Sequence, residues 1–201
     1  MSFGRSHLFV LAALTLAAGC KKPAVDTGPK GPVGITHPEL PCAEGTIGLG
    51  APPPEGNEIY CARVYPDGKI TRQGPAIEWY SASRKKAQGA YMEDKKSGPW
   101  QVWHPNGAVQ EQGSYVAGNK EGPWVAFHAN GERASEGEFI GGNEAGTWTF
   151  WSEDGLTRTE GKYDNFGQRT GTWVDHSADD KPLRERNYRN GRLINQREYD
   201  N

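Results

Sequence analysis

The sequence lacks several features that would assign a protein to a common functional class. Basic side chains are no more numerous than acidic ones, 23 against 25, which excludes a strongly basic surface for nucleic acid. Only 3 cysteines are present, so at most one disulfide can form within the chain. The long apolar run at residues 8–16 is shorter than the about 20 residues that a membrane-spanning helix needs.

What the sequence does contain is glycine and large aromatic side chains in unusual number. The 201 residues include 27 glycines, 7 tryptophans, 8 tyrosines and 6 phenylalanines. Disordered chains are poor in aromatic residues, whereas abundant glycine together with aromatics favours short strands joined by tight turns. The composition therefore predicts an all-β fold.

The first 19 residues have the order of a bacterial secretory signal. Arg5 precedes the apolar run, and small residues follow this run up to Cys20. The ending Ala-Ala-Gly-Cys resembles the lipobox of bacterial lipoproteins, with Ala17 where leucine is usual. The resemblance implies cleavage before Cys20 and acylation of this cysteine. Ordinary cleavage that leaves an unused thiol is the alternative.

Acylation of Cys20 would anchor the mature chain to a membrane, because two or more acyl chains hold a protein stably. Lys21 and Lys22 follow with no aspartate next to the cysteine, a pattern similar to that of lipoproteins sorted to the outer membrane. Residues 20–41 are rich in proline and glycine and predict a semi-rigid linker. We therefore expect a location in the cell envelope, facing the periplasm or the cell surface.

With Cys20 acylated, Cys42 and Cys61 are left as a pair. The cell envelope outside the inner membrane is oxidising, so we expect these two cysteines to form a disulfide that closes the segment 42–63. Coordination of a metal by the two thiolates is the alternative, but only His37 lies nearby in the sequence to add a ligand. We expect no metal and no cofactor.

Residues 64–201 are dominated by a repeat with a period of 24 residues. Three types of position recur at fixed offsets, and the units near the two ends depart from the pattern. The recurring sets are Gly89, Gly113, Gly137 and Gly161; Tyr91, Tyr115, Phe139 and Tyr163; and Trp100, Trp124, Trp148 and Trp173. One hairpin cannot bury its aromatic side chains alone, so we expect the units to stack side by side.

Each unit is expected to form a β-hairpin. Asn106-Gly107 and its equivalents are typical of two-residue turns in which both residues take positive φ. The other connection, such as residues 117–122, is expected to be a longer turn bracketed by glycine. Glycine near aromatics within strands indicates that a ring covers the bare backbone. Four to five units predict about eight to ten strands, ended by an arginine-rich strand that resists further pairing.

The pattern Tyr-x-x-Gly-x-x-x-Gly-x-Trp-x-x-Trp, seen best at residues 115–127, resembles the MORN repeat variant. The resemblance extends over residues 64–201 and implies an elongated, meandering antiparallel sheet of hairpins. Repeats of this kind are taken as interaction or membrane-associated modules, and bacterial proteins that carry them are often described as antitoxin-like. The resemblance therefore implies a binding function.

A second aromatic row is the best candidate for a binding surface. Four aromatic residues recur in register on the strand face opposite the Trp100 set: Trp79, Trp103, Phe127 and Trp151. A single-layered sheet cannot easily bury both rows, so we expect one to be partly exposed and able to contact a protein, a glycan or a lipid headgroup. The alternative is that both rows are structural and covered by long side chains such as Arg133 and Lys120.

No catalytic group of residues is recognisable. His104 and His128 occupy the same position of the repeat, which is typical of polar residues beside turns. We expect a non-enzymatic, lipid-anchored envelope protein whose repeat surface mediates protein interaction or scaffolding. Binding of cell-wall glycan through the aromatic row and neutralisation of a toxin are the alternatives, and nucleic acid is not expected as a partner.

Overall fold

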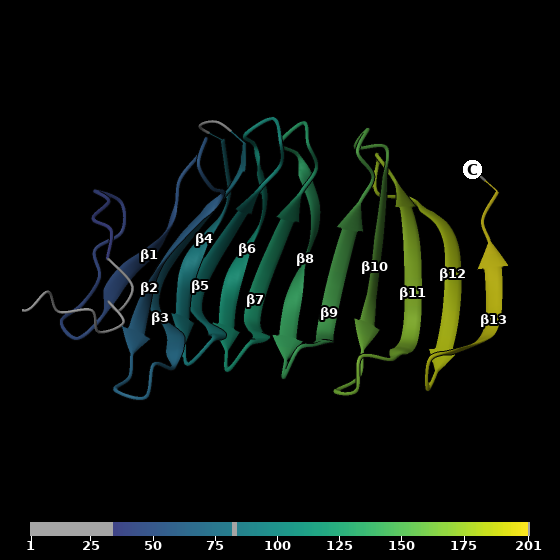
Figure 1. Cartoon of the computed structure of the whole chain (residues 1–201). Helices are drawn as coiled ribbons and strands as arrows, with labels where there is room; N and C mark the ends of the chain where they lie inside the picture. The colour runs from purple at the N-terminus through teal and green to yellow at the C-terminus, as the bar shows by residue number, and fades with distance from the viewer. Residues whose placement is uncertain (1–33, 82–83, 201) are drawn as a thin grey trace, which may run out of the picture. The chain divides into compact units, whose positions relative to one another are not determined.

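The computed structural model describes residues 34–81 and 84–200, which form one antiparallel sheet of 13 strands (Figure 1). Every strand is hydrogen-bonded to its neighbours in the chain, so the sheet is a simple meander. The strands are β1 Ile47–Ala51, β2 Glu58–Val64, β3 Ile70–Ser81, β4 Arg84–Met92, β5 Lys95–Trp103, β6 Val109–Val116, β7 Asn119–Phe127, β8 Arg133–Ile140, β9 Asn143–Trp151, β10 Thr157–Tyr163, β11 Arg169–Ser177, β12 Pro182–Arg189 and β13 Arg192–Glu198. The predicted all-β fold is confirmed.

The expected signal peptide, Cys20 and most of the expected linker lie outside the described residues. Within residues 34–81 and 84–200, no helix is long and apolar enough to cross a membrane.

The sheet begins earlier in the chain than the sequence predicts. The disulfide-closed segment is part of the sheet, because β1 and β2 pair from Ile47 opposite Ala62 onwards. Ile35 also forms an isolated bridge with Gly48, so the end of the segment expected to be a linker contacts β1. β1 and β2 account for two of the 13 strands, and the other 11, β3 to β13, lie in the predicted repeat region, which therefore forms more strands than the about eight to ten expected.

The two-residue turns lie at the other edge of the sheet from the one the sequence predicts. Between β6 and β7, Ala117 and Gly118 have φ of 49° and 91°, and Val116 pairs with Asn119 on either side of them. Two successive residues of positive φ define the turn whose twist suits a hairpin. The longer connection expected at 117–122 is therefore wrong.

The Asn-Gly turns have a different geometry, and the prediction of positive φ at both residues is wrong for them. Gly107 has a φ of 93°, whereas Asn106 is not among the residues of positive φ. The His104 N–H donates to the Ala108 carbonyl and the Gly107 N–H to the His104 carbonyl, a three-residue loop that ends in a bulge glycine. Pro105 favours this form, because its fixed φ suits the first central position of a type I turn.

The sheet is held together by contacts between tryptophan and glycine on neighbouring strands. The indole of Trp124 on β7 covers Gly113 on β6 so closely that a Cβ at this glycine would overlap the ring. The indole N–H donates to the Ser114 carbonyl at 3.1 Å. The same contact recurs for Trp100 with Gly89, Trp148 with Gly137 and Trp173 with Gly161. The prediction that rings cover bare backbone is confirmed.

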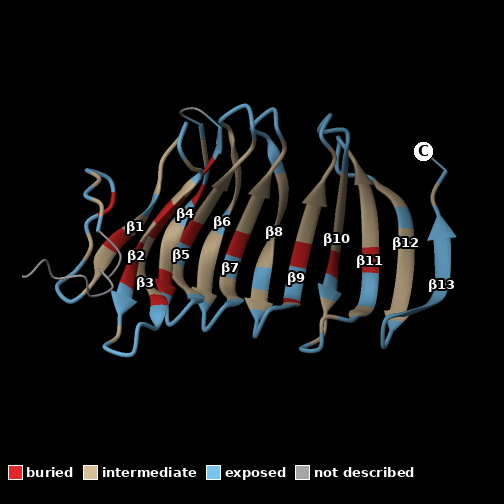
Figure 2. Cartoon of the chain, in the orientation of Figure 1, coloured by how far each residue is buried: buried red, intermediate tan, exposed pale blue. Residues whose placement is uncertain are grey.

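These tryptophans form a continuous ladder with the tyrosine and phenylalanine positions of the repeat. Ring centroids lie 5.1 Å apart for Tyr115 and Trp124 and 5.9 Å apart for Trp124 and Phe139, both edge to face. Figure 2 shows the buried residues as a band across the middle of β5, β7, β9 and β11. We call the side of the sheet that carries this ladder of rings the indole face.

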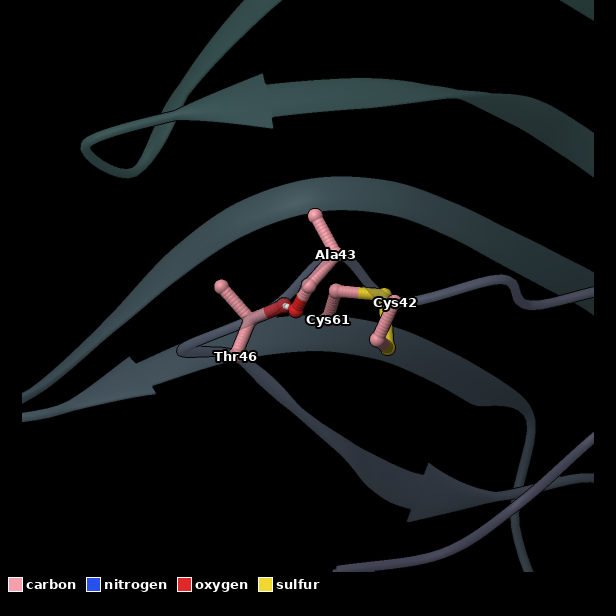
Figure 3. The surroundings of a disulfide bond; sticks show 4 residues. All are labelled: Cys42, Ala43, Thr46 and Cys61. Carbon is pink, nitrogen blue, oxygen red and sulfur yellow. Dashed lines mark hydrogen bonds between the residues drawn. A yellow bond between two sulfur atoms is a disulfide. The ribbon is translucent and has the colours of Figure 1, made fainter.

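The N-terminal segment covers the first strands on the opposite side. Cys42 and Cys61 form the predicted disulfide, and the Thr46 hydroxyl donates to the Ala43 carbonyl at 2.6 Å beside it (Figure 3). Leu40 packs into a buried cluster whose other members are Ile59, Cys61, Ile77 and Trp79. This segment therefore acts as a cap on the first edge of the sheet.

In the last unit of the sheet, an arginine stands where a glycine pairs with the tryptophan in the earlier units. Trp148 pairs with Gly161, but Trp173 pairs with Arg186 on β12, and no tryptophan follows on β13. The Arg186 guanidinium donates to Asp175 at 2.5 Å. Every residue of β13 is exposed, in keeping with the predicted arginine-rich edge strand.

Candidate functional site

The predicted aromatic row lies on the side of the sheet opposite the indole face, and we call this side the row face. Trp103, Phe127 and Trp151 are half-buried on β5, β7 and β9, whereas Trp79 on β3 is only 7% exposed. The tryptophans of the indole face are thus fully covered. The partial exposure predicted for one of the two rows is found in three of the four residues of the aromatic row.

Trp79 differs from the other three because the N-terminal segment lies on it. Its indole packs against Leu40 and Ile77, and the His37 ring meets it edge to face at 6.1 Å between centroids. The other three residues of the row extend beyond this cover. Trp79 therefore belongs to the core, and the accessible part of the aromatic row is Trp103, Phe127 and Trp151.

Hydrogen bonds between successive turns fix the backbone of the row. The Tyr80 hydroxyl donates to the Trp103 carbonyl at 2.8 Å. His104 Nε2 lies 2.9 Å from the Phe127 carbonyl, and His128 Nε2 lies 2.8 Å from the Trp151 carbonyl. A carbonyl only accepts, so both histidines carry a proton on Nε2. Their expected role beside turns is confirmed, and it extends to linking each hairpin to the next.

Arginine side chains lie across the strands from the later rungs of the row. Phe127 pairs with Arg133 and Trp151 with Arg158. Arg158 is neutralised by Asp180, whose carboxylate accepts at 2.6 Å. The row thus offers aromatic surface edged by paired charges, the mixture that protein interfaces use at their rims.

An open groove of about 850 Å³ lies next to the N-terminal segment and is lined by residues of β3 to β7, none of which belongs to the aromatic row. Its walls are mostly uncharged and include three glutamines and four prolines: Gln88, Gln101, Gln112, Pro41, Pro75, Pro99 and Pro123. Of these, Gln88 and Gln112 and the last three prolines recur at the period of the repeat. Gln101 is the cross-strand neighbour of both Gln88 and Gln112, so the three amides form a line across β4, β5 and β6.

Glu39 is the single ionisable side chain in the groove lining. It pairs with Lys85 at 2.5 Å, and the hydrogen bond from this ammonium lowers the pKa of the Glu39 carboxyl. The groove therefore presents amide donors and acceptors with little net charge, which suits a neutral polar ligand such as polypeptide backbone. The groove was not predicted from the sequence, although three of the prolines that line it, Pro75, Pro99 and Pro123, recur there every 24 residues.

The repeat pattern has a counterpart among known families. The family model of the MORN repeat variant matches residues 96–117, which span β5 and β6. The chain carries a MORN repeat variant. No curated protein sequence matches the chain. The MORN-variant segment contains Trp100, Trp103 and Gly113, so residues of both the indole face and the row face belong to the matched pattern.

Proposed function

We propose that this protein is a non-enzymatic lipoprotein of the cell envelope, whose row face binds a protein partner in a scaffolding role. One observation carries the proposal. The N-terminal segment covers the first rung of the aromatic row, Trp79, and leaves Trp103, Phe127 and Trp151 half-buried on the strands that follow. A partner that packs on these three rungs would continue the cover that the chain itself begins.

The chemistry of the groove supports a polypeptide as the partner. Aromatic side chains supply contact area at low entropic cost, and a line of glutamines can pair with backbone N–H and C=O groups. The MORN-variant match supports a repeat-based binding role. The turn-to-turn hydrogen bonds hold the row in place, so little ordering would be needed on binding.

The test is affinity capture from envelope extracts with the full chain as bait. We expect the double variant Trp103→Ala plus Trp151→Ala to lose a protein that the native chain retains. The matched control removes two apolar side chains that are even more exposed but lie in turns, Leu156 and Phe166, at 59% and 79% exposure. Equal retention by the row variant and the control would refute the row as the binding surface.

Glycan binding is the second candidate, favoured by half-buried aromatic rings on the row face and by amide side chains in the groove. Aromatic rings stack on sugar rings, and amides pair with hydroxyl groups. Digestion of the extract with polysaccharide-cleaving enzymes before capture separates the two functions. Loss of capture after digestion favours glycan, whereas unchanged capture favours protein.

Anchoring by lipid is tested separately from binding. Metabolic labelling with a clickable fatty acid should mark the native chain and should not mark a Cys20→Ala variant. If both chains carry the label equally, acylation at Cys20 is refuted, and the proposal for the row face stands independently of that result.

A further inference from the structure

On the indole face, a basic side chain lies over the rings of most units. The Lys96 ammonium lies 4.1 Å from the centroid of the Trp100 ring, and the Lys120 ammonium lies 4.0 Å from that of Trp124. The Arg169 guanidinium lies 4.4 Å from the Trp173 ring. Each cation also faces the aromatic ring of the following strand. These distances are those of cation–π contacts, so the ladder is built to hold positive charge.

One unit of this series has an acidic residue instead. Glu144 on β9 occupies the position that Lys120 has one unit earlier and Arg169 one unit later. Among the described residues, no basic side chain lies over the Trp148 ring and Glu144 makes no ion pair. Its carboxylate instead interacts with the hydroxyl of Tyr163, whose pKa burial raises. The ladder therefore lacks its cation at this unit alone among the units from β5 to β11.

A cavity of about 180 Å³ lies at the same place. Its lining includes the rings of Trp124, Phe139, Trp148 and Phe150, together with Glu144. Two small side chains make room for it, because Ala126 on β7 and Ser135 on β8 are cross-strand partners. In the preceding unit the equivalent pair is Val102 and Glu111, which are larger.

The charge of the cavity also favours a cation. Glu111 and Lys120 both line it, but they neutralise each other through an ion pair of 2.7 Å. The Glu144 carboxylate is left as the net charge, next to the rings of Trp148 and Phe150, which stack on each other with centroids 5.7 Å apart. The volume corresponds to about six water molecules, the size of a short alkylammonium or alkylguanidinium group.

We propose that this cavity, lined by Glu144, Trp148 and Phe150, binds the head group of an organic cation. The ammonium or guanidinium would replace the lysine or arginine that the neighbouring units supply from their own chain. A basic side chain of a protein and a free or lipid-borne amine share this chemistry. The site lies on the indole face, so it is separate from the row face and does not depend on the function proposed for that face.

The test is titration of the full chain, with the indole N–H resonance of Trp148 as the readout. The probes are n-butylammonium, n-butylguanidinium and an acetylated, amidated Gly-Lys-Gly peptide, each up to about 10 mM. We expect a saturable shift with at least one probe and about tenfold weaker binding to Glu144→Gln, because a charged acceptor becomes neutral. Preference for the peptide would identify a protein source, and preference for the free amines a small molecule or headgroup.

Two further variants make the result decisive. Ala126→Leu fills the cavity without a change of charge and should abolish the shift. Glu132→Gln removes the same charge from an exposed turn and should bind as the native chain does. The proposal is overturned if no probe produces a saturable shift, if Glu144→Gln binds unchanged, or if Glu132→Gln weakens binding as much as Glu144→Gln.

Discussion

At the scale of single residues, one glycine in each repeat unit provides the flat backbone on which an indole ring packs. These glycines are Gly89, Gly113, Gly137 and Gly161. Each glycine lies under a tryptophan whose N–H bonds to the carbonyl of the next residue, as Trp148 does with Glu138 at 3.1 Å. The ring is buried and held at one end by this bond, so it cannot move aside to admit a side chain. Glycine is therefore required at these positions for space, although their φ values are ordinary.

Gly137→Ala is expected to lower the free energy of unfolding by about 1–3 kcal/mol, because the new methyl group would overlap the Trp148 ring. Urea denaturation followed by tryptophan fluorescence measures the change. Glu138→Ala, at the adjacent exposed position, should stay within about 0.5 kcal/mol of the native chain. Equal effects of the two substitutions would show that the ring yields to the methyl group.

Glu58 makes the free energy of unfolding depend on pH. Burial raises the pKa of its carboxyl above the ordinary value, even though Arg72 donates to Oε2 at 2.9 Å. Oε1 is buried without a partner in the described part of the chain. A raised carboxyl pKa stabilises the fold below the pKa of the unfolded state, and this stabilisation is lost as the pH rises through the folded-state value.

Glu58→Gln should therefore gain stability relative to the native chain as the pH rises from the unfolded-state carboxyl pKa of about 4.3 through the raised folded-state value. Parallel urea titrations of the two chains at several pH values give the difference in unfolding free energy. A difference that is constant over this range would contradict the assignment of the raised pKa to Glu58.

At the scale of elements, the compact unit is the hairpin with the two-residue turn, such as β6 with β7. It contains both partners of one glycine–indole contact, Gly113 and Trp124. The Asn-Gly loops instead connect one such hairpin to the next, where side chains such as Asn106 and His104 reach the following loop. The repeat is thus a series of self-contained hairpins joined by a second network of hydrogen bonds.

His104→Ala plus His128→Ala should lower the free energy of unfolding by about 1 kcal/mol for each lost bond, because two carbonyls on the row lose their donors. Thermal and urea unfolding measure the loss. His104→Gln plus His128→Gln is the control, since an amide N–H can donate in place of the ring. Native stability in the alanine variant would mean that water replaces both bonds at no cost.

The sequence predicted the hairpins and the covered glycines because both depend on residues close together in the chain. It did not predict the turn types, since Asn-Gly suits two kinds of hairpin turn and the choice depends on Pro105 and on the Asn106 side chain, which accepts from the Ala108 N–H at 3.0 Å. Burial of Trp79 was equally hidden, because Leu40 reaches it from a segment that the sequence presents as linker.

At the scale of the whole molecule, the two ends of the sheet are finished by different means. A disulfide-closed segment covers the first strands, whereas every side chain of the last described strand, β13, is exposed, including Leu193 and Ile194. The middle is periodic, so its length is not set by any contact between the ends. Stability should accordingly be close to a sum of contributions from units and their interfaces.

Reduction of the Cys42–Cys61 disulfide should lower the free energy of unfolding by about 3 kcal/mol, because the bond links residues 19 apart in sequence. Urea unfolding with and without dithiothreitol measures the change. Reductant should have no effect on Cys42→Ser plus Cys61→Ser. An unchanged midpoint for the native chain would mean that the packing of Leu40 suffices to hold the segment.

Deletion of residues 113–136 removes one period and should leave a folded sheet, because Gly137 then takes the place of Gly113 opposite Trp100. The denaturant m value should fall in proportion to the surface lost. Deletion of residues 119–130 removes one strand, reverses all later strands and should prevent cooperative unfolding. Cooperative unfolding of both deletions would argue against strict side-by-side pairing.

The glycine–indole contacts are local, and this affects how a newly made chain can fold. Trp124 bonds to a carbonyl only 10 residues earlier, so a hairpin can close as soon as its own residues have emerged. Local contacts form fast because little loop entropy is lost. A chain delivered N-terminus first can therefore add each finished hairpin to those before it, starting from the disulfide-closed segment, and no strand has to wait for a distant partner.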